Sequence, residues 1–224
     1  MPSYRYVQRY RPRDGSRLPH VSAFVKQLSE VIHAPGLFDD AGKQVGLAES
    51  GIAALYATRL GKTRHPECGV DFDLFTDLPD TEDVSRFEFH VGTAPGEPFL
   101  DFFALQLAQT AQPLSAEVVA GLVEIDEPVE AFLGENNNEF DREAKRRQNQ
   151  IRDFSRPALI RGIHFLGPQQ VGSLGGLEVC MRAPVWRVRA VAGGVLLQLT
   201  EGEFDPRDSE HLRAQSIAME YFRL

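Results

Sequence analysis

The chain has 224 residues and a formal net charge of −8, with 42% hydrophobic and 25% charged residues. These proportions are ordinary for a globular protein and exclude a disordered, collagen-like or simple-repeat chain. No stretch approaches 18 consecutive apolar residues, so the sequence predicts no membrane-spanning helix. The two cysteines are too few for a disulfide framework, and the basic N-terminus is not followed by the apolar segment of a secretory signal. We therefore expect a cytoplasmic protein. The negative charge opposes nucleic-acid binding and favours a basic partner.

The first 60 residues predict two strand regions and two helices. Residues 4–10 alternate with a period of two, which is typical of a strand. Apolar residues at helical spacing over 18–32 predict a helix that Pro35-Gly36 ends. The glycines of 37–46 indicate a hairpin, and residues 48–60 favour a second helix.

The middle of the chain mixes both kinds of pattern. Residues 70–74 and 86–91 alternate between apolar and polar side chains, which predicts two half-buried strands. The composition of 99–109 and 115–124 favours helices, the second opened by a serine cap. Another helix is predicted over 140–154, where apolar residues form a narrow stripe.

The final third favours short strands, followed by a helix that ends the chain. The strands are expected at 158–166, 177–181, 186–191 and 195–200, with a tight turn at 192–194. Asp205-Pro206 is expected to begin the terminal helix. Its predicted buried face consists of Leu212, Ile217, Ala218, Tyr221 and Phe222. Trp186 is expected to pack in an apolar setting near the sheet.

Together these elements predict an α+β fold in which helices flank a largely antiparallel or mixed β-sheet. No linker rich in Gly, Ser or Pro divides the sequence, and no internal repeat is visible. We therefore expect a single domain over residues 1–224.

Two glycine-containing segments resemble parts of nucleotide-binding loops. Leu60-Gly61-Lys62-Thr63 resembles the end of a phosphate-binding loop, but the glycine required five residues earlier is Tyr56, and no buried strand leads into the segment. Gly172, Gly175 and Gly176 lack the strand-to-helix context of a dinucleotide loop, which favours turn residues. The sequence therefore predicts no nucleotide cofactor.

The sequence contains few residues in patterns that are typical of a metal site or of a catalytic nucleophile. His65-x-x-Cys68 has no second ligand pair of the kind that structural zinc requires. Asp71, Asp73, Glu88 and His90 would share one sheet face if their strands are neighbours, and could then bind a divalent ion for hydrolysis. An ordinary polar outer face explains the same residues. No Gly-x-Ser-x-Gly nucleophile turn occurs.

Alternating tyrosine and arginine at residues 4–10 also has two interpretations. Aromatic faces stack on bases and arginines bind phosphates, which is one way of holding single-stranded nucleic acid. Tyrosines along one strand face more often pack into a core with their hydroxyls at its rim. The acidic chain favours the second interpretation.

Charge is distributed unevenly along the chain. Residues 65–85 contain seven acids and no Lys or Arg, and residues 117–143 contain nine acids against one arginine. A solvated surface accounts for such runs, but a field of one sign also steers a partner of opposite charge. The hypothesis for partner binding consists of Glu67, Asp71, Asp73, Asp77, Asp80, Glu82, Asp83 and Glu88.

The last third carries a resemblance to a known family. It contains the segments 161–166 (RGIHFL), 193–200 (GGVLLQLT) and 203–205 (EFD), followed by His211, Ala214, Ile217 and Leu224. This pattern resembles the immunity protein 52 family of bacterial polymorphic toxin systems, in which a Gly-Gly-Val-Leu strand is followed by Phe-Asp and a closing helix. The resemblance covers about 65 residues.

The resemblance implies a cytoplasmic antidote without an active site, metal or cofactor. Such a protein binds a cognate toxin, typically a nuclease of restriction-endonuclease-like fold delivered by contact-dependent or type VI secretion. The competing hypotheses are a metal-dependent hydrolase that uses Asp71, Asp73, Glu88 and His90, and a scaffold or adaptor without a toxin partner.

Overall fold

The computed structural model describes residues 3–10, 18–31, 36–39, 41, 43–62, 70–75, 86–93, 101–107, 115–124, 128–136 and 155–224. Its strands are β1 (Ser3–Tyr10), β2 (Gly36–Phe38), β3 (Gln44–Gly46), β4 (Val70–Phe75), β5 (Arg86–Thr93), β6 (Asp101–Leu107), β7 (Glu130–Asn136), β8 (Ile163–Leu166), β9 (Arg187–Val191) and β10 (Gly194–Gln198). Its helices are α1 (Leu18–Val31), α2 (Glu49–Lys62), α3 (Ala116–Glu124), α5 (Pro168–Ser173), α6 (Leu177–Met181) and α7 (Ser209–Tyr221).

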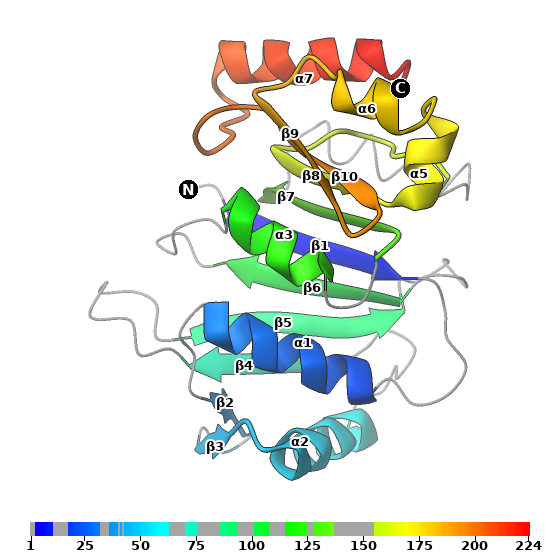
Figure 1. The fold of residues 1–224 in the computed structure, drawn as a ribbon. Helices are drawn as coiled ribbons and strands as arrows, with labels where there is room; N and C mark the ends of the chain where they lie inside the picture. The colour runs from blue at the N-terminus through cyan, green and yellow to red at the C-terminus, as the bar shows by residue number, and fades with distance from the viewer. Residues whose placement is uncertain are drawn as a thin grey trace.

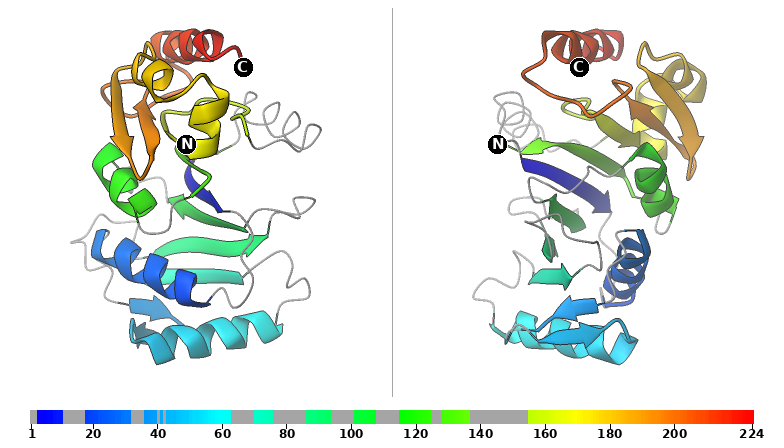
Figure 2. Two further views of the ribbon diagram at one scale, coloured as in Figure 1. Left: turned by 45° about the vertical axis from the view of Figure 1, so that its right-hand side comes forward. Right: turned by 90° about the vertical axis from the view of Figure 1, so that its left-hand side faces the viewer.

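The described strands join one sheet in the order β3-β2-β4-β5-β6-β1-β7-β8-β10-β9, and their pairings are antiparallel (Figure 1). Helices accompany the sheet along its length (Figure 2). The predicted α+β fold with a largely antiparallel sheet is therefore confirmed. The single-domain boundary at 1–224 stays a prediction.

The first strand lies in the middle of this sheet. Hydrogen bonding joins β1 to β6 on one side and to β7 on the other. The side chains of Tyr6, Val7 and Gln8 are all buried, because a central strand is covered on both faces. Gln8 satisfies its amide by donating from Nε2 to the Leu122 carbonyl of α3, at 3.0 Å.

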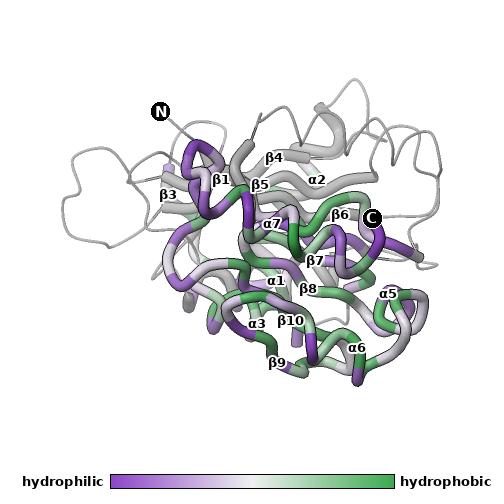
Figure 3. The backbone as a smooth tube through the Cα atoms, turned by 90° about the horizontal axis from the view of Figure 1, so that it is seen from above, coloured by the Kyte–Doolittle hydropathy of each residue, from purple (hydrophilic) through white to green (hydrophobic). Residues whose placement is uncertain are grey.

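The sheet register assigns the helices of the second half to opposite faces. Gln8, Ala131, Phe165 and Leu196 are consecutive partners across β1, β7, β8 and β10, and Gln8 contacts α3. The apolar residues next to Phe165 and Leu196 on β8 and β10 project to the opposite face of the sheet. There they form a hydrophobic core with residues of α5, α6 and α7. It consists of Ile160, Leu166, Val171, Leu174, Cys180, Ala183, Val195, Leu197, Leu199, Phe204, Ala218 and Phe222. Figure 3 shows a hydrophobic stretch along β8.

Several predicted elements are confirmed. The strands over 4–10, 70–74 and 86–91 and the helices over 18–32 and 48–60 lie where they were expected, apart from small shifts at their ends. The hairpin within residues 37–46 is formed by β2 and β3. The helix at 115–124 is α3, and Ser115 Oγ accepts a hydrogen bond from the Val118 amide at 3.3 Å. The tight turn at 192–194 joins β9 to β10, with positive φ at Ala192 and Gly193.

Other predictions are wrong. Residues 101–107, expected to be helical, form β6, which pairs with β5 on one side and β1 on the other, because long-range strand pairing overrides the local composition. Residues 177–181, expected to be a strand, form α6, whose alternating apolar side chains are largely exposed. The strands β8, β9 and β10 are shorter than predicted, while β7 and α5 were not anticipated. The helix predicted over 140–154 lies outside the described residues.

The terminal helix begins later than Asp205-Pro206 suggests. Asp208 is the N-cap of α7, and its carboxylate accepts a hydrogen bond from the Glu210 amide at 2.8 Å. Asp205 instead accepts from the Arg207 amide at 2.9 Å in a tight turn. The predicted buried face is partly wrong: Ala218 and Phe222 are buried, but Ile217 and Tyr221 are 41% and 38% exposed. The unforeseen buried residue is Gln215, whose amide donates to the Ile160 carbonyl at 2.7 Å.

Replacing Asp208 by alanine is expected to lower the free energy of unfolding by about 1 kcal/mol, because the first turn of α7 loses its side-chain cap. Thermal or urea unfolding measures this loss. Ser209→Ala is the matched control, since this neighbouring side chain is exposed and contributes no cap bond. Equal stability of the two variants would show that the Asp208 cap contributes nothing.

Candidate binding pocket beside Trp186

Most of the predicted acidic surface lies outside the described residues. This holds for Glu67, Asp77, Asp80, Glu82 and Asp83. The remaining three, Asp71, Asp73 and Glu88, belong to β4 and β5, which are neighbouring antiparallel strands. Whether these acids bind a partner stays a prediction.

The register of β4 and β5 agrees with the proposed juxtaposition of four polar residues. Asp71 is the backbone partner of His90, and Asp73 is the partner of Glu88. Directly opposed residues of an antiparallel pair project to the same face. The arrangement that the hydrolase hypothesis requires is therefore present at the level of the backbone.

The structure describes some of the residues of the glycine-containing and tyrosine-rich motifs. Gly61 and Lys62 end helix α2, whereas the lysine of a phosphate loop lies where a helix begins. Gly175 and Gly176 are turn residues with positive φ, as expected, but Gly172 belongs to α5. His65 and Cys68 lie outside the described residues. Tyr6 is buried in the central strand, which favours the core interpretation over nucleic-acid stacking.

A surface pocket of about 360 Å³ lies where α3, the start of β9 and the loop after β10 meet. Gly134, Gly162, Ile163 and Phe204 are among its lining residues, and Trp186 stands at its edge. The pocket is lined by Ser115, Ala116, Glu117, Leu133, Gly134, Gly162, Ile163, Trp186, Arg187, Gln198, Glu201, Gly202, Glu203 and Phe204. The prediction that Trp186 packs in an apolar setting is wrong, because its side chain is 58% exposed.

The loop over 199–204 is held in place by backbone bonds and by one aromatic side chain. The Leu199 amide donates to the Gly162 carbonyl at 2.9 Å, and Thr200 Oγ1 donates to the Gly202 carbonyl at 3.0 Å. Phe204 is buried against Gly162, where a Cβ would approach the Phe204 Cβ to 2.5 Å. A glycine at 162 therefore allows Phe204 to anchor the loop.

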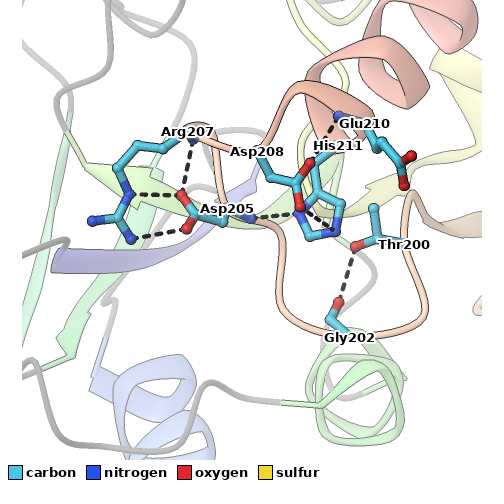
Figure 4. A network of polar contacts seen from close by, with 7 residues as sticks. All are labelled: Thr200, Gly202, Asp205, Arg207, Asp208, Glu210 and His211. Atoms are coloured by element: carbon cyan, nitrogen blue, oxygen red, sulfur yellow. Dashed lines mark hydrogen bonds and ion pairs between the residues drawn. The ribbon is translucent and has the colours of Figure 1, made fainter.

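Polar contacts tie the same loop to the start of α7 (Figure 4). The Asp205 amide donates to His211 Nδ1 at 2.9 Å, and the His211 ring stacks on Phe204 with centroids 5.8 Å apart. Arg207 donates to both carboxylate oxygens of Asp205, at 2.8 and 2.9 Å. The hydrogen bond from the Asp205 amide to His211 and the stacking of His211 on Phe204 connect the Glu-Phe-Asp segment to α7. Together these contacts orient the surface loop.

Charges of both signs line the pocket. Arg187 Nη1 lies 2.6 Å from Glu117 Oε1 on α3. The pKa of Glu117 is lowered by a backbone hydrogen bond and by its hydrogen bond to Arg187. Within the described part of the chain, the carboxylates of Glu201 and Glu203 enter no such ion pair. The pocket therefore has an excess of negative charge.

A buried charged cluster lies elsewhere in the sheet, where β1, β7 and β8 meet. Glu130 is only 3% exposed, and its carboxylate lies 2.6 Å from Arg9 Nη1 and 3.2 Å from His164 Nε2. His164 Nδ1 accepts the Arg161 amide at 3.3 Å, so its remaining proton belongs on Nε2, toward Glu130. The Arg161 guanidinium lies 4.2 Å from the ring centroid of Phe132, which stacks on His164.

The electrostatics of the cluster keep Glu130 ionised. Burial acts to raise the pKa of Glu130, but the charge of Arg9 and the hydrogen bond from His164 outweigh it and lower the pKa to about 2. Burial lowers the pKa of His164, which the adjacent carboxylate only partly counteracts. At neutral pH the cluster is a carboxylate paired with Arg9 beside a neutral imidazole. These groups are buried and lie against one another, which suits a structural role.

Exposed apolar side chains gather near the C-terminal end of the chain. Among the described residues, the large exposed ones are Leu177, Val179, Met181, Trp186, Ile217 and Tyr221. Tyr221 of α7 donates its hydroxyl to the Val179 carbonyl of α6 at 2.9 Å, so these two residues lie next to each other. Clustered exposed apolar groups mark surfaces that contact other proteins.

The pocket was not predicted from the sequence, because its walls come from segments that are separated by up to about 90 residues. The available signal was the single tryptophan of the chain next to an arginine, which was interpreted as a core position. The Glu130 cluster was missed for the same reason, since sheet register alone brings Arg9 to Glu130.

The sequence matches no known family model and no curated protein sequence. Among solved structures, the chain is similar to the T6SS protein PA0821 of Pseudomonas aeruginosa, with a TM-score of 0.54 and 12% sequence identity. The likeness covers 100% of this chain and 73% of that one. At this identity it shows a shared fold alone. No helix in the described ranges is long and apolar enough to cross a membrane.

Proposed function

We propose that this protein belongs to a type VI secretion context and acts as an immunity protein, which neutralises a cognate nuclease toxin by binding it in the cytoplasm. The observation that carries the proposal is the exposed apolar surface of α6, α7 and Trp186, because such a surface suits a protein partner. The fold shared with a T6SS protein supports the context, and the resemblance of residues 161–224 to the immunity protein 52 family supports the antidote role.

In this proposal an apolar surface and an acidic surface contribute to binding in different ways. Exposed apolar side chains supply the desolvated contacts that set the lifetime of a complex. The acidic residues around β4 and β5 supply a negative field that attracts a basic toxin and raises the association rate. Catalysis is not part of this function.

The direct test uses the product of a neighbouring gene that encodes a toxin with a C-terminal nuclease domain. We expect the two proteins to purify as a complex and co-expression to protect cells from the toxin. A nuclease from an unrelated toxin is the control and should neither bind nor be neutralised. Complete absence of both binding and protection would contradict the proposal and favour a scaffold or adaptor.

The acidic surface is tested by Asp71→Lys, Asp73→Lys and Asp77→Lys combined. Reversing three charges is expected to slow toxin association by about tenfold or more at low salt, and less at physiological salt, because screening weakens the field. Stopped-flow binding measures the rate. Glu30→Lys, Glu49→Lys and Glu210→Lys form the charge-matched control. Equal rates for both triple variants would remove the acidic surface from the interface.

Metal-dependent hydrolysis is the second candidate function, favoured by the register that pairs Asp71 with His90 and Asp73 with Glu88. Opposed carboxylates and an imidazole are ligands that divalent metals accept. A phosphodiester hydrolysis that requires added Mg²⁺ or Mn²⁺ and is lost in folded Asp73→Ala and Glu88→Ala variants would replace the antidote proposal with this one.

A further inference from the structure

The pocket beside Trp186 combines a free aromatic face with unpaired carboxylates. Trp186 is the only tryptophan of the chain, and its indole makes no ring stacking, cation–π contact or side-chain hydrogen bond with any described residue. A largely exposed indole without a partner retains the capacity to bind a cation over its ring face. Tryptophan is the best of the aromatic side chains for this interaction.

The charges of the pocket favour a cation as its occupant. Arg187 is the positively charged lining residue, and its guanidinium is already bound to Glu117 at 2.6 Å. This pairing leaves Glu201 and Glu203, on the loop beside the indole, as the net charge of the lining. Gly202, which Figure 4 labels, lies between these two glutamates in the sequence and also lines the pocket.

An anion is disfavoured at the same place. The N-terminus of α3 reaches the pocket, but Ser115 Oγ already accepts one of its free amides, and Glu117 supplies a negative charge in its first turn. A metal ion is disfavoured as well, because the described His, Cys, Asp and Glu side chains form no group of three that could hold one. Carboxylates beside an aromatic ring instead suit an organic cation.

We propose that this pocket receives an arginine or lysine side chain of a protein partner, with the cation between the Trp186 ring and the carboxylates of Glu201 and Glu203. The volume of about 360 Å³ lies at the small end of ligand pockets, which suits one long side chain. A guanidinium fits best, since it stacks on an indole and donates to carboxylates in its own plane. The inference rests on the proposed function, because a basic toxin is the partner that would supply such a side chain.

The position of the pocket makes it separable from the acidic surface. Among the strands that line the pocket, β7 is the nearest to β4 in the sheet, at four strand positions, or about 19 Å at a spacing of ~4.8 Å. At this distance substitutions act independently. Variants of the pocket should therefore change the dissociation rate of a toxin complex, while the Asp→Lys variants change the association rate.

The test uses a small probe, acetyl-arginine amide, and follows the indole N–H resonance of Trp186, which is unambiguous in a chain with one tryptophan. We expect a saturable shift with a dissociation constant in the millimolar range, as befits a single side chain. Acetyl-citrulline amide, which has nearly the same shape without the charge, should bind at least about fivefold more weakly.

Substitutions complete the test. Glu201→Gln and Glu203→Gln combined should weaken the probe about fivefold to tenfold, while Glu220→Gln, an exposed glutamate on α7 away from the pocket, should leave binding unchanged. In Trp186→Ala, followed by the Gly202 amide resonance, saturable binding should be lost. No saturable shift in the unaltered protein, equal binding of citrulline, or unchanged binding in the double glutamine variant would each overturn the proposal.

Failure of the pocket proposal can be distinguished from failure of the proposed immunity function. If acetyl-arginine amide binds as expected but no toxin is captured, the pocket stands and the proposed function falls. If a toxin is captured while the probe fails, the function stands and this pocket is not its cation receptor.

Discussion

Replacing Glu130 by alanine is expected to lower the free energy of unfolding by about 3–5 kcal/mol, the largest effect among the described charged residues. The carboxylate lies 2.6 Å from Arg9 in a site where both side chains are largely removed from water. Its removal leaves the guanidinium of Arg9 without this partner and His164 without an acceptor. Urea unfolding measures the loss. Glu178→Ala, which breaks the exposed pair with Arg182, should cost less than about 1 kcal/mol.

The pH dependence of stability follows from the same cluster. The folded-state pKa of Glu130 is lowered from 4.5 to about 2, so its contribution is complete above about pH 4.5 and is lost as the pH falls toward 2. The pKa of His164 is also lowered, so below its ordinary value of 6.5 the unfolded chain binds the extra proton more readily. Both effects destabilise the protein in acid. Glu130→Gln should flatten the loss between pH 4.5 and 2, and an unchanged profile would assign it to other groups.

Alanine at Gly167 and at Gly172 is expected to change stability in opposite directions. At Gly167 a Cβ would approach the Val129 carbonyl oxygen to 2.3 Å, although the backbone conformation itself, with φ of −68°, suits any residue. The clash involves backbone that also donates from the Val129 amide to the Arg9 carbonyl, so we expect a loss of about 2–3 kcal/mol.

Gly172 provides the matched comparison, because a Cβ there meets nothing within 4 Å and the residue lies inside α5. Alanine should raise the free energy of unfolding by about 0.5–1 kcal/mol, since it loses less conformational entropy than glycine in a helix. Thermal unfolding of both variants measures the contrast. A shift in the same direction for both would contradict this assignment of the two glycines.

The fold could be predicted from the sequence wherever the periodicity is clear. The alternation in β1, β4 and β5 identified all three strands, and helical spacing identified α1. The same reasoning failed where the pattern is short or ambiguous. In β6 the apolar residues at 102–105 do not alternate with polar ones, whereas the apolar residues of α6 alternate as in a strand and are mostly at the surface.

The candidate sites were beyond prediction because long-range pairing assembles them. Glu130 and His164 are 34 positions apart, and their contact depends on how β7 aligns with β8. Trp186 was expected to be buried because tryptophan usually is, and only the position of the loop after β10 shows that it borders a pocket. What the sequence did show, the uneven distribution of charge, bears on the partner and not on the geometry.

The central place of the first strand has a consequence for how the chain folds during synthesis. Tyr4 pairs with Leu107 on one side, and Tyr6 pairs with Leu133 on the other. β1 is therefore synthesised before both of its neighbours, and about 90 residues separate its end at Tyr10 from the start of β6 at Asp101. Pairings of such long sequence separation form slowly, and an unpaired strand is prone to aggregate meanwhile. The two halves of the sheet can join only after β7 has been synthesised. A chain that lacks β1 would therefore be left with two incomplete sheets and no strand to join them.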